Sequence, residues 1–543
     1  METGTCGLSY QNCTCQSSSL IISRRHWNFN SIDVEDPATG EIFARCHSAS
    51  PEDVSDTIQI AHETFESGIW SRKSRHERAD VLERAADLLT NKIPALIPLE
   101  VRQTGRAIRE MKAQVPSLVR WFKYYAALLR TEERSVLPTS GKLHNWVDRK
   151  PLGVVVQITP FNHPLLIAVK KLAPALAAGN SVILKPSELT PLTSLILGEI
   201  LKEAGLPTGV FSVLPGYGHI TGNALVSSQL VRKVDVTGGT EAGRIIGGIV
   251  GRNLAKYTAE LGGKAPVIVF ERADITAAIN GVSFGAFVAS GQTCVAATRI
   301  IVQNSIFQEF TDRLSKKAES IKVRMGDPKN PESMMGPLVS SKQLSNVSKF
   351  VREAVDSGVA KAVIGGNRMQ GQSPLDGFNY ENGYFFEPTI LVPADKGSIP
   401  HDQIADRANT GSSSILSSQA WMKEIFGPVI VVVGFDDEKE AIALANNSEF
   451  GLGAAIWTQD LSQGFRVSEE IDSGIVWINT HHRNDPSSPW GGAKGPSGVG
   501  SENGIDAYHA YSKAKSTIIN YASTEETRAD DWFREGNQEV RYG

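Results

Sequence analysis

The sequence predicts an α/β protein built around parallel sheets that helices cover. Short β-rich runs alternate with helical stretches between residues 151 and 270, and further strand and helix signals follow residue 294. Such alternation is typical of parallel sheets whose connecting helices lie on the faces. The chain has 543 residues, which is too long for one hydrophobic core and indicates two or three domains.

Composition and charge exclude several functional classes. Hydrophobic residues make up 41% and charged residues 21% of the chain, as in an ordinary globular protein. The formal net charge of −4 gives no basic surface of the kind that nucleic acid requires. No apolar run approaches the length needed to cross a bilayer, so we expect no membrane partner.

Cysteine usage favours a reducing compartment. The chain has five cysteines, an odd number that does not fit a disulfide framework. Cys6, Cys13 and Cys15 lie in a Ser/Thr-rich start without apolar periodicity, which predicts a disordered tail over residues 1–29 rather than a metal site. No secretion signal is visible, so we expect a cytoplasmic protein, with an organellar transit peptide as the lesser alternative.

The segment before residue 151 is predicted to be mostly helical. Pro, Gly and Asp at 36–41 indicate a turn between two short strands. Ser50, followed by a proline and two acids, is typical of a helix N-terminus, and helical signals continue to about residue 131. The polar, alternating stretch 141–148 indicates an exposed hairpin.

Residues 151–270 are predicted to form a parallel sheet. Its β-rich runs are 152–158, 181–184, 211–214, 233–236 and 266–270. Ligands of such sheets bind at the carboxyl ends of the strands, so the segment is typical of a dinucleotide-binding fold. The usual G-x-G-x-x-G fingerprint is missing, because the glycines of 216–222 enclose one residue too many. Thr237, Gly238 and Gly239 end a strand and open a helix, where free amide groups favour a pyrophosphate.

One carboxylate and one thiol stand where each could do chemistry. Glu260 lies at a glycine turn before the apolar run 265–270, and Cys294 lies at a glycine interruption of a small-residue stretch, 284–299, that is predicted to be helical. A thiol attacks carbonyls, and a carboxylate can deprotonate the water that releases the acyl group. Taken alone, the pair also fits a solvated turn acid and an inert packing cysteine.

The sequence around these residues resembles the aldehyde dehydrogenase superfamily, of the NAD(P)-dependent, hydrolytic type. Glu-Leu-Gly-Gly-Lys at 260–264 precedes Gly-Gln-Thr-Cys at 291–294. Further motifs of the family appear in order at 160–164, 185–188, 237–240, 424–428 and 489–492. The resemblance covers roughly residues 30–520, and several such motifs in one order are a specific signal.

The resemblance implies two parallel α/β, Rossmann-like domains plus a small β element that bridges subunits of a homodimer or homotetramer. The implied parts are a dinucleotide-binding domain at 30–137 and 151–262, a catalytic domain at 263–486, oligomerisation strands at 138–150 and 498–521, and a surface tail at 522–543. Residues 395–420 depart from the family. They are rich in Ser, Asn, Asp and Gly, which predicts a weakly ordered surface insertion to which we assign no function.

The resemblance also implies catalytic roles. Cys294 attacks a small-molecule aldehyde and forms a thiohemiacetal, and Glu260 activates the water that later hydrolyses the thioester. The side-chain amide of Asn162 and the backbone N–H of Cys294 form the oxyanion hole. An asparagine in the proline-bounded turn 160–164 is otherwise a common turn former.

The implied cofactor is NAD, with NADP less favoured. Lys185 and Glu188, with Ser187 between them, hold the adenosine ribose, and the carboxylate would repel a 2′-phosphate. Without the resemblance, Lys185 and Glu188 would be interpreted as a charged pair in a surface turn. The family's variant Rossmann fold lacks the usual fingerprint, so its absence here does not count against NAD. Glu424 grips the nicotinamide ribose and Phe426 packs near the ring; the plainer interpretation is a loop acid and a core aromatic.

The substrate side is predicted to be polar. His163 and Lys170 occupy positions that are often aromatic in family members acting on simple aldehydes, and with Arg483 they suggest a substrate that carries an anionic or hydroxylated group. The competing interpretation is that Lys170 points into solvent. His481 and His482 are adjacent and cannot share a helix face, so no metal site is expected.

Two alternatives to a hydrolytic aldehyde dehydrogenase remain at this point. A coenzyme A-acylating enzyme would pass the thioester to a thiol instead of water, and the presence of Glu260 argues against it. A catalytically silent structural or binding protein could share the fold, although every expected catalytic group is retained.

Overall fold

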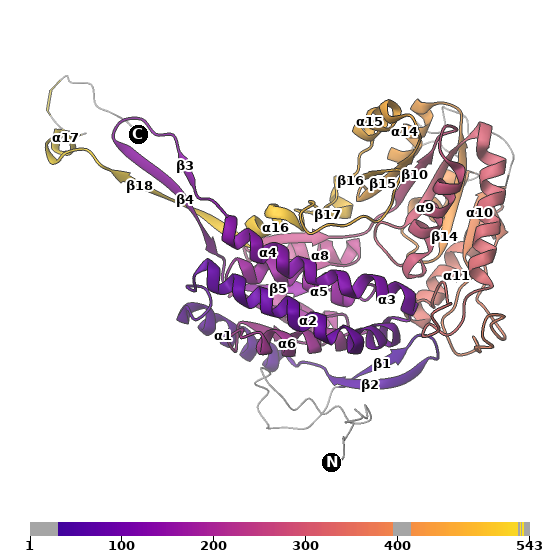
Figure 1. The fold of residues 1–543 in the computed structure, drawn as a ribbon, viewed down its shortest axis with the longest axis horizontal. Helices are drawn as coiled ribbons and strands as arrows, with labels where there is room; N and C mark the ends of the chain where they lie inside the picture. The colour runs from indigo at the N-terminus through magenta and orange to yellow at the C-terminus, as the bar shows by residue number, and fades with distance from the viewer. Residues whose placement is uncertain (1–30, 395–413, 530, 532, 534, 537–543) are drawn as a thin grey trace, which may run out of the picture.

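Two sheets organise the body of the molecule in the computed structural model, which describes residues 31–394, 414–529, 531, 533, 535 and 536. One has the strand order β17-β9-β8-β5-β6-β7, and the other has the order β12-β13-β14-β11-β10-β15-β16. Helices pack against both sheets (Figure 1). The predicted α/β class is therefore confirmed.

The strands of both sheets are mostly parallel. The first sheet contains β5 (Val154–Ile158), β6 (Ser181–Lys185), β7 (Phe211–Val213), β8 (Val231–Thr237), β9 (Lys256–Glu260) and an antiparallel edge, β17 (Gly498–Val499). The second contains β10 (Ala265–Val269), β11 (Ala297–Gln303), β13 (Thr389–Pro393), β14 (Val429–Phe435), β15 (Gly453–Trp457), β16 (Ile475–Ile478) and an antiparallel edge, β12 (Ala360–Ile364).

The fifth parallel strand of the first sheet differs from the prediction. The apolar run 266–270 was expected there, but it forms β10 and belongs to the second sheet. The strand beside β8 is β9, whose sequence Lys-Tyr-Thr-Ala-Glu carries too few apolar residues to stand out. As a result, Glu260 ends one sheet and residue 265 begins the other.

The helices follow the strands in alternation. Those of the first half are α1 (Pro51–Ser67), α2 (Arg75–Thr104), α3 (Ile108–Gln114), α4 (Val119–Thr131), α5 (Pro164–Ala177), α6 (Leu192–Glu203), α7 (Asn223–Ser227) and α8 (Thr240–Arg252). Those of the second half are α9 (Ile275–Phe287), α10 (Phe307–Lys322), α11 (Ser341–Asp356), α13 (Gln419–Met422), α14 (Glu438–Asn446), α15 (Leu461–Glu470), α16 (Gly504–Ala510) and α17 (Thr524–Ala529). The predicted start of α1 is confirmed, because Ser50 and Asp53 form a capping box.

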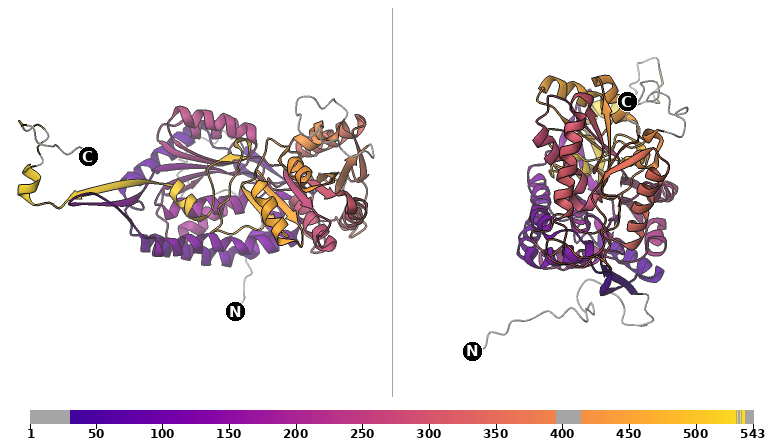
Figure 2. Two further views of the ribbon diagram at one scale, coloured as in Figure 1. Left: turned by 90° about the horizontal axis from the view of Figure 1, so that it is seen from above. Right: turned by 90° about the vertical axis from the view of Figure 1, so that its right-hand side faces the viewer.

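Two small β elements lie outside these sheets. The predicted strands around 36–41 form the hairpin β1 (Ser31–Asp36) and β2 (Glu41–His47). The predicted hairpin 141–148 is part of an arm in which β4 (Leu143–Pro151) pairs with β3 (Ser135–Leu137) and β18 (Ser512–Asn520). Figure 2 shows the arm reaching well beyond the body. The predicted oligomerisation segment 498–521 lies only partly in this arm. Its first part forms β17 and α16, which belong to the body.

The predicted insertion at 395–420 is only partly described. Residues 395–413, like the predicted tail 1–29, lie outside the described residues. Residues 415–420 are not a polar surface loop. They form a 3₁₀ turn and the start of α13, and Ile415, Leu416 and Ala420 are buried in the core of the second domain. The insertion therefore ends earlier than predicted, because its last residues supply apolar side chains.

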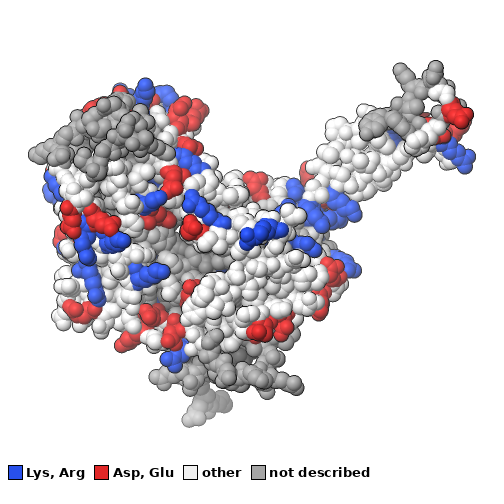
Figure 3. Space-filling model, turned by 180° about the vertical axis from the view of Figure 1, so that it is seen from behind, with Lys and Arg blue, Asp and Glu red and all other residues white. Residues whose placement is uncertain are grey.

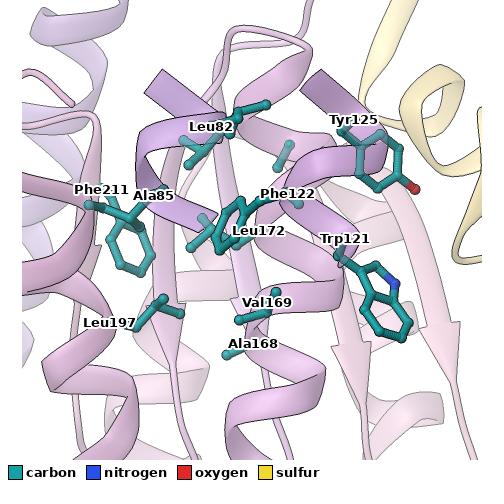
Figure 4. Close-up of a cluster of buried hydrophobic side chains, with 14 of the residues drawn as sticks. Leu82, Ala85, Trp121, Phe122, Tyr125, Ala168, Val169, Leu172, Leu197 and Phe211 are labelled. Atoms are coloured by element: carbon teal, nitrogen blue, oxygen red, sulfur yellow. The ribbon is translucent and has the colours of Figure 1, made fainter. Parts of the chain in front are cut away.

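A large apolar core holds α2, α4, α5 and α6 against the first sheet. Leu82 of α2, Phe122 of α4 and Leu172 of α5 interlock with Leu197 and Phe211 (Figure 4). Each such side chain contributes about 1.5–3 kcal/mol by leaving water. α5 is therefore held in a fixed position by this packing, and so are the residues at its N-terminus.

The surface carries charges of both signs. In Figure 3 acidic and basic side chains are mixed over the body, and Lys and Arg gather where the arm meets it. Within the described ranges, the helices are all too short or too polar to span a bilayer.

Candidate active site

Cys294 follows a turn whose backbone is strained at two residues. α9 ends at Phe287, and Ala289 and Ser290 have φ values of +53° and +56°, so the predicted helix through 284–299 is wrong. A left-handed residue other than glycine costs roughly 1–2 kcal/mol. The turn is held by Ser290 Oγ, which donates to the Gly336 carbonyl at 2.8 Å, and by Glu110, which accepts from the Ala289 N–H at 3.1 Å.

Cys294 is half-buried, and its carbonyl packs against Gly263, which follows β9. Burial raises the pKa of its thiol to about 12, and the carboxylates of Glu424 and Glu260 add to the effect. The resting group is therefore a neutral thiol. Its backbone N–H has no acceptor among the described residues, which leaves one donor free beside the sulfur.

Asn162 reaches the same turn from the end of the first sheet. It lies after β5, and its side-chain Nδ2 donates to the Gln292 carbonyl at 2.8 Å. Only 8% of the residue is exposed. The structure thus places the Asn162 amide against the turn that carries Cys294, two residues before the thiol.

Glu260 is a buried carboxyl without partners. It is 2% exposed, and neither of its side-chain oxygens has a hydrogen-bond partner in the described chain. Burial, followed by the nearby carboxylate of Glu502, raises its pKa well above the usual value. A buried carboxyl with a raised pKa is typical of a functional site rather than of a solvated turn.

A buried charge network lies beside Glu260. Lys171 donates to both Asp235 and Glu502, and Tyr511 donates to Asp235. Lys170 forms an ion pair with Glu502 at 2.7 Å. The two ammonium groups hold the pKa of Glu502 low, at about 2, despite burial. Of the two neighbouring carboxyls, Glu502 therefore has a lowered pKa and Glu260 a raised one.

The position of Lys170 differs from both interpretations of the sequence. The side chain is 2% exposed, so it does not point into solvent. Its ammonium lies 4.6 Å from the centre of the Trp490 ring, and Glu502 already matches its charge. Lys170 is consequently not a free cation that awaits an anionic substrate.

The other residues predicted to face the substrate have separate environments. His163 Nδ1 lies 2.6 Å from Arg106 Nη1. Arg483 is exposed, and its Nε donates to Thr480 Oγ1 at 3.4 Å. His481 and His482 join through their Nδ1 atoms at 2.6 Å, and burial lowers the pKa of both. Within the described ranges no three His, Cys, Asp or Glu side chains are grouped to hold a metal ion.

An open cradle lies at the end of β8. Gly239 caps α8 without any side-chain hydrogen bond, so amide groups of the first turn are available. A methyl group added at Gly238 would meet only the Val236 side chain, at 4.0 Å, and one added at Gly239 would meet nothing within 4 Å. Thr237, the last residue of β8, contacts Glu502 through its hydroxyl at 3.4 Å. The cradle suits a pyrophosphate.

The residues predicted to hold the adenosine ribose lie at the end of β6. Lys185 Nζ donates to the Pro186 carbonyl at 2.9 Å and lies 3.5 Å from the Glu188 carboxylate. Ser187 and Glu188 also line a cavity of about 540 Å³. Lys185 and Glu188 thus form one charged pair beside open space.

The residues predicted to hold the nicotinamide end lie between the two sheets. Glu424 accepts from the Gly263 N–H at 3.0 Å, and burial raises its pKa to about 7. Phe426 has a left-handed φ of +57° and packs edge-on against Phe161, with ring centres 5.7 Å apart. Both residues therefore lie beside the turns that carry Cys294 and Asn162.

Comparison with known proteins agrees with this geometry. The sequence model of the aldehyde dehydrogenase family matches residues 25–403 and 415–517. This chain belongs to the aldehyde dehydrogenase family. Phenylacetaldehyde dehydrogenase of Pseudomonas fluorescens is 38% identical over 90% of this chain and 93% of its own length. Betaine aldehyde dehydrogenase of Brucella anthropi is 38% identical over 89% and 92%.

Solved structures show the same relationship. A putative aldehyde dehydrogenase from Burkholderia cenocepacia superposes with a TM-score of 0.83 at 37% identity, covering 90% of this chain and 94% of that one. Betaine aldehyde dehydrogenase from Staphylococcus aureus in complex with NAD⁺ superposes with a TM-score of 0.84 at 32% identity, covering 91% and 92%. This aldehyde dehydrogenase is thus an oxidoreductase of a family that acts on aldehydes.

The buried charge network of this aldehyde dehydrogenase contains residues that were not predicted from the sequence. Lys171 stands next to Lys170 within the apolar helix α5, and two lysines in such a setting signal buried partners. Their partners Asp235 and Glu502 could not be named in advance, since they lie 64 and 331 residues from Lys171 in the chain.

The contact between Gly263 and Cys294 can be tested in this aldehyde dehydrogenase. Gly263→Ala should lower the free energy of unfolding by about 2–3 kcal/mol, because the new Cβ would lie 2.0 Å from the Cys294 carbonyl oxygen. Gly248→Ala is the control, since nothing lies within 4 Å of that site in α8 and alanine favours a helix. Urea unfolding measures both. Equal stability of Gly263→Ala and wild type would contradict the close packing.

Proposed function

We propose that this aldehyde dehydrogenase oxidises an aldehyde to its carboxylic acid, with NAD as the hydride acceptor, through a thioester on Cys294 that is hydrolysed by water. One observation carries the proposal. A thiol, a free backbone N–H and the amide of Asn162 meet at one turn, and a buried carboxyl without partners, Glu260, lies close enough to raise the pKa of that thiol.

The first step is addition of the sulfur to the aldehyde. As the C–S bond forms, the thiol of Cys294 loses its proton to solvent water and the carbonyl oxygen becomes an oxyanion. Asn162 Nδ2 and the Cys294 N–H donate to that oxygen. One such donor is typically worth about 10²–10³ in rate. NAD, when bound, supplies the hydride acceptor that turns the thiohemiacetal into a thioester.

The second step is hydrolysis. Glu260, as a carboxylate, removes a proton from water, and the hydroxide adds to the acyl carbon while the C–S bond breaks. The proton that Glu260 has gained then passes to the thiolate of Cys294, whose raised pKa makes it the stronger base, and the neutral thiol is restored. Because hydrolysis needs only water and a base, no coenzyme A is required.

The residues present fit NAD. Gly238 and Gly239 leave room for a pyrophosphate at the uncapped start of α8, and Lys185 and Glu188 form the pair that would hold the adenosine ribose. Glu424 would accept from the nicotinamide ribose, and Phe426 would pack near the ring. The Glu188 carboxylate supports NAD over NADP by repelling a 2′-phosphate.

The assay that tests the proposal compares cofactors on a panel of aldehydes. Purified protein should give steady NADH formation with NAD, and about tenfold less with NADP, since repulsion between the Glu188 carboxylate and a 2′-phosphate at about 4 Å is worth about 1–4 kcal/mol. Coenzyme A is omitted in one arm and added in another. Absence of NADH with every aldehyde, or a strict need for coenzyme A, would overturn the proposal.

We further propose a homodimer or homotetramer in the cytoplasm, with the two Rossmann-like domains divided near residue 262. The arm β3-β4-β18 supports oligomerisation, because its strands extend from the body and leave unpaired edges for another subunit. A reducing compartment is supported by the chemistry, since the Cys294 thiol must stay reduced to attack.

A further inference from the structure

The residue after Asn162 is a histidine whose proton position is determined by its neighbours. Arg106 Nη1 lies 2.6 Å from His163 Nδ1, and Gln114 Nε2 lies 3.0 Å from it. A guanidinium can only donate, so Nδ1 must accept. Arg106 also donates to Gln114 Oε1 at 3.0 Å, which turns the amide nitrogen of Gln114 toward His163. The neutral ring therefore carries its proton on Nε2.

The neighbours that hold this tautomer are themselves buried and paired. Arg106 is 3% exposed, and its Nε donates to Glu110 at 2.9 Å. Glu110 in turn accepts from the Ala289 N–H in the turn that carries Cys294. Burial and the charge of Arg106 lower the pKa of His163 well below its usual value. The ring thus stays neutral, and its orientation is tied to the position of the nucleophile.

The Nε2–H of His163 has no protein acceptor in the described part of the chain. It lies on the side of the ring away from Arg106. His482 is close enough to His163 to influence its pKa, and the His482 ring packs edge-on against the half-exposed Phe284. The free Nε2–H of His163 therefore lies beside Asn162, in a region that also contains the aromatic rings of His482 and Phe284.

The charges around this region are matched within the protein. Glu110 compensates Arg106, and Glu502 compensates Lys170. His481 and His482 are neutral, and the Nε2 atom of each is buried without a partner among the described residues. Apart from the exposed Arg483, which has no ion-pair partner among the described residues, the region offers a carboxylate no unpaired cation in exchange for its hydration, whereas an uncharged oxygen would gain hydrogen bonds.

We propose that His163 determines specificity, by donating its Nε2–H to an uncharged oxygen of the aldehyde, so that the enzyme selects hydroxylated aldehydes with an aromatic body over unsubstituted and carboxylate-bearing ones. This inference rests on the proposed function and narrows it. It retains the hydroxylated half of the hypothesis made from the sequence and replaces the anionic half, because the lysine that suggested an anion is already paired.

The test measures kcat/KM with NAD for benzaldehyde, for its three hydroxylated isomers and for 4-carboxybenzaldehyde. His163→Phe keeps a ring but removes the donor, and it should lower the ratio of kcat/KM for the best hydroxylated isomer to that for benzaldehyde about tenfold. His163→Gln keeps an N–H and should retain most of the ratio. His76→Phe, at an exposed position in α2, is the matched control and should leave the ratio unchanged.

Each outcome bears on a different claim. Because each ratio is compared with that of wild type, intrinsic differences in aldehyde reactivity cancel. An unchanged ratio in His163→Phe, with turnover intact, would overturn the inference and leave the proposed function standing. A wild-type preference for the carboxylate that is lost in Arg483→Ala would also overturn it. Absence of NADH from every aldehyde would overturn both, and melting curves confirm that each variant is folded.

Discussion

Cys294→Ala should abolish NADH formation, with a loss on the order of 10⁴-fold or more in kcat. The variant lacks the only atom proposed to bond with the aldehyde carbon, while Asn162 and the Cys294 N–H remain in place. The expected loss therefore exceeds the contribution of any single hydrogen-bond donor at the site. Stopped-flow absorbance during the first turnover checks this, because a slow later step cannot then hide the chemistry.

The same variant should still fold and bind NAD. The side chain at residue 294 is small and half-buried, and the left-handed turn before it is held by Ser290 and Glu110 rather than by the sulfur. Thermal unfolding and a fluorescence titration with NAD are the controls. A Cys294→Ala enzyme that binds NAD and retains more than about one hundredth of the wild-type rate would exclude Cys294 as the nucleophile, since covalent catalysis is worth far more than that.

Local pattern was enough to predict the elements that apolar periodicity defines. The runs that became β5, β6, β7 and β8 were recognisable because parallel strands are buried on both faces. β9 was not, because its Lys-Tyr-Thr-Ala-Glu sequence lacks such a run. Assigning its place to the stronger apolar run of β10 put one strand in the wrong sheet.

The turn at Ala289 and Ser290 shows where local pattern fails. Small residues in sequence favour a helix, and nothing nearby in the chain opposes one. The left-handed backbone is imposed by partners far away, since Glu110 lies 179 residues and Gly336 lies 46 residues from the groups they bind. Long-range contacts of this kind override helix propensity, which is worth only tenths of a kcal/mol per residue.

The paired state of Lys170 was hidden for the same reason. From sequence, a lysine near a predicted catalytic asparagine suggests either a ligand for an anion or a solvated charge. Only the fold brings Glu502 to its ammonium. That pair also explains the opposite pKa shifts of the two neighbouring carboxyls, because two lysines lower the pKa of Glu502 whereas burial without a partner raises that of Glu260.

Glu260→Gln should separate the two halves of the reaction. Acylation of Cys294 does not need the carboxylate, so the variant should release about one NADH per site in a burst, with steady turnover lower by about 10²–10⁴-fold as expected for loss of a general base. Hydroxylamine should cleave the accumulated thioester and yield a hydroxamate. Glu41→Gln, at an exposed position in β2, is the control and should cycle normally.

The pH dependence gives an independent check on the same carboxyl. Burial and the charge of Glu502 raise the pKa of Glu260, so hydrolysis should speed up as the pH rises and the carboxylate forms. Glu260→Gln cannot titrate at this position and should lose that rise. Normal steady turnover of Glu260→Gln, or a hydrolysis rate that falls with rising pH in wild type, would assign the base to another residue. The ionised Glu502 would then be the next candidate, although its lysine partners make it a weak proton acceptor.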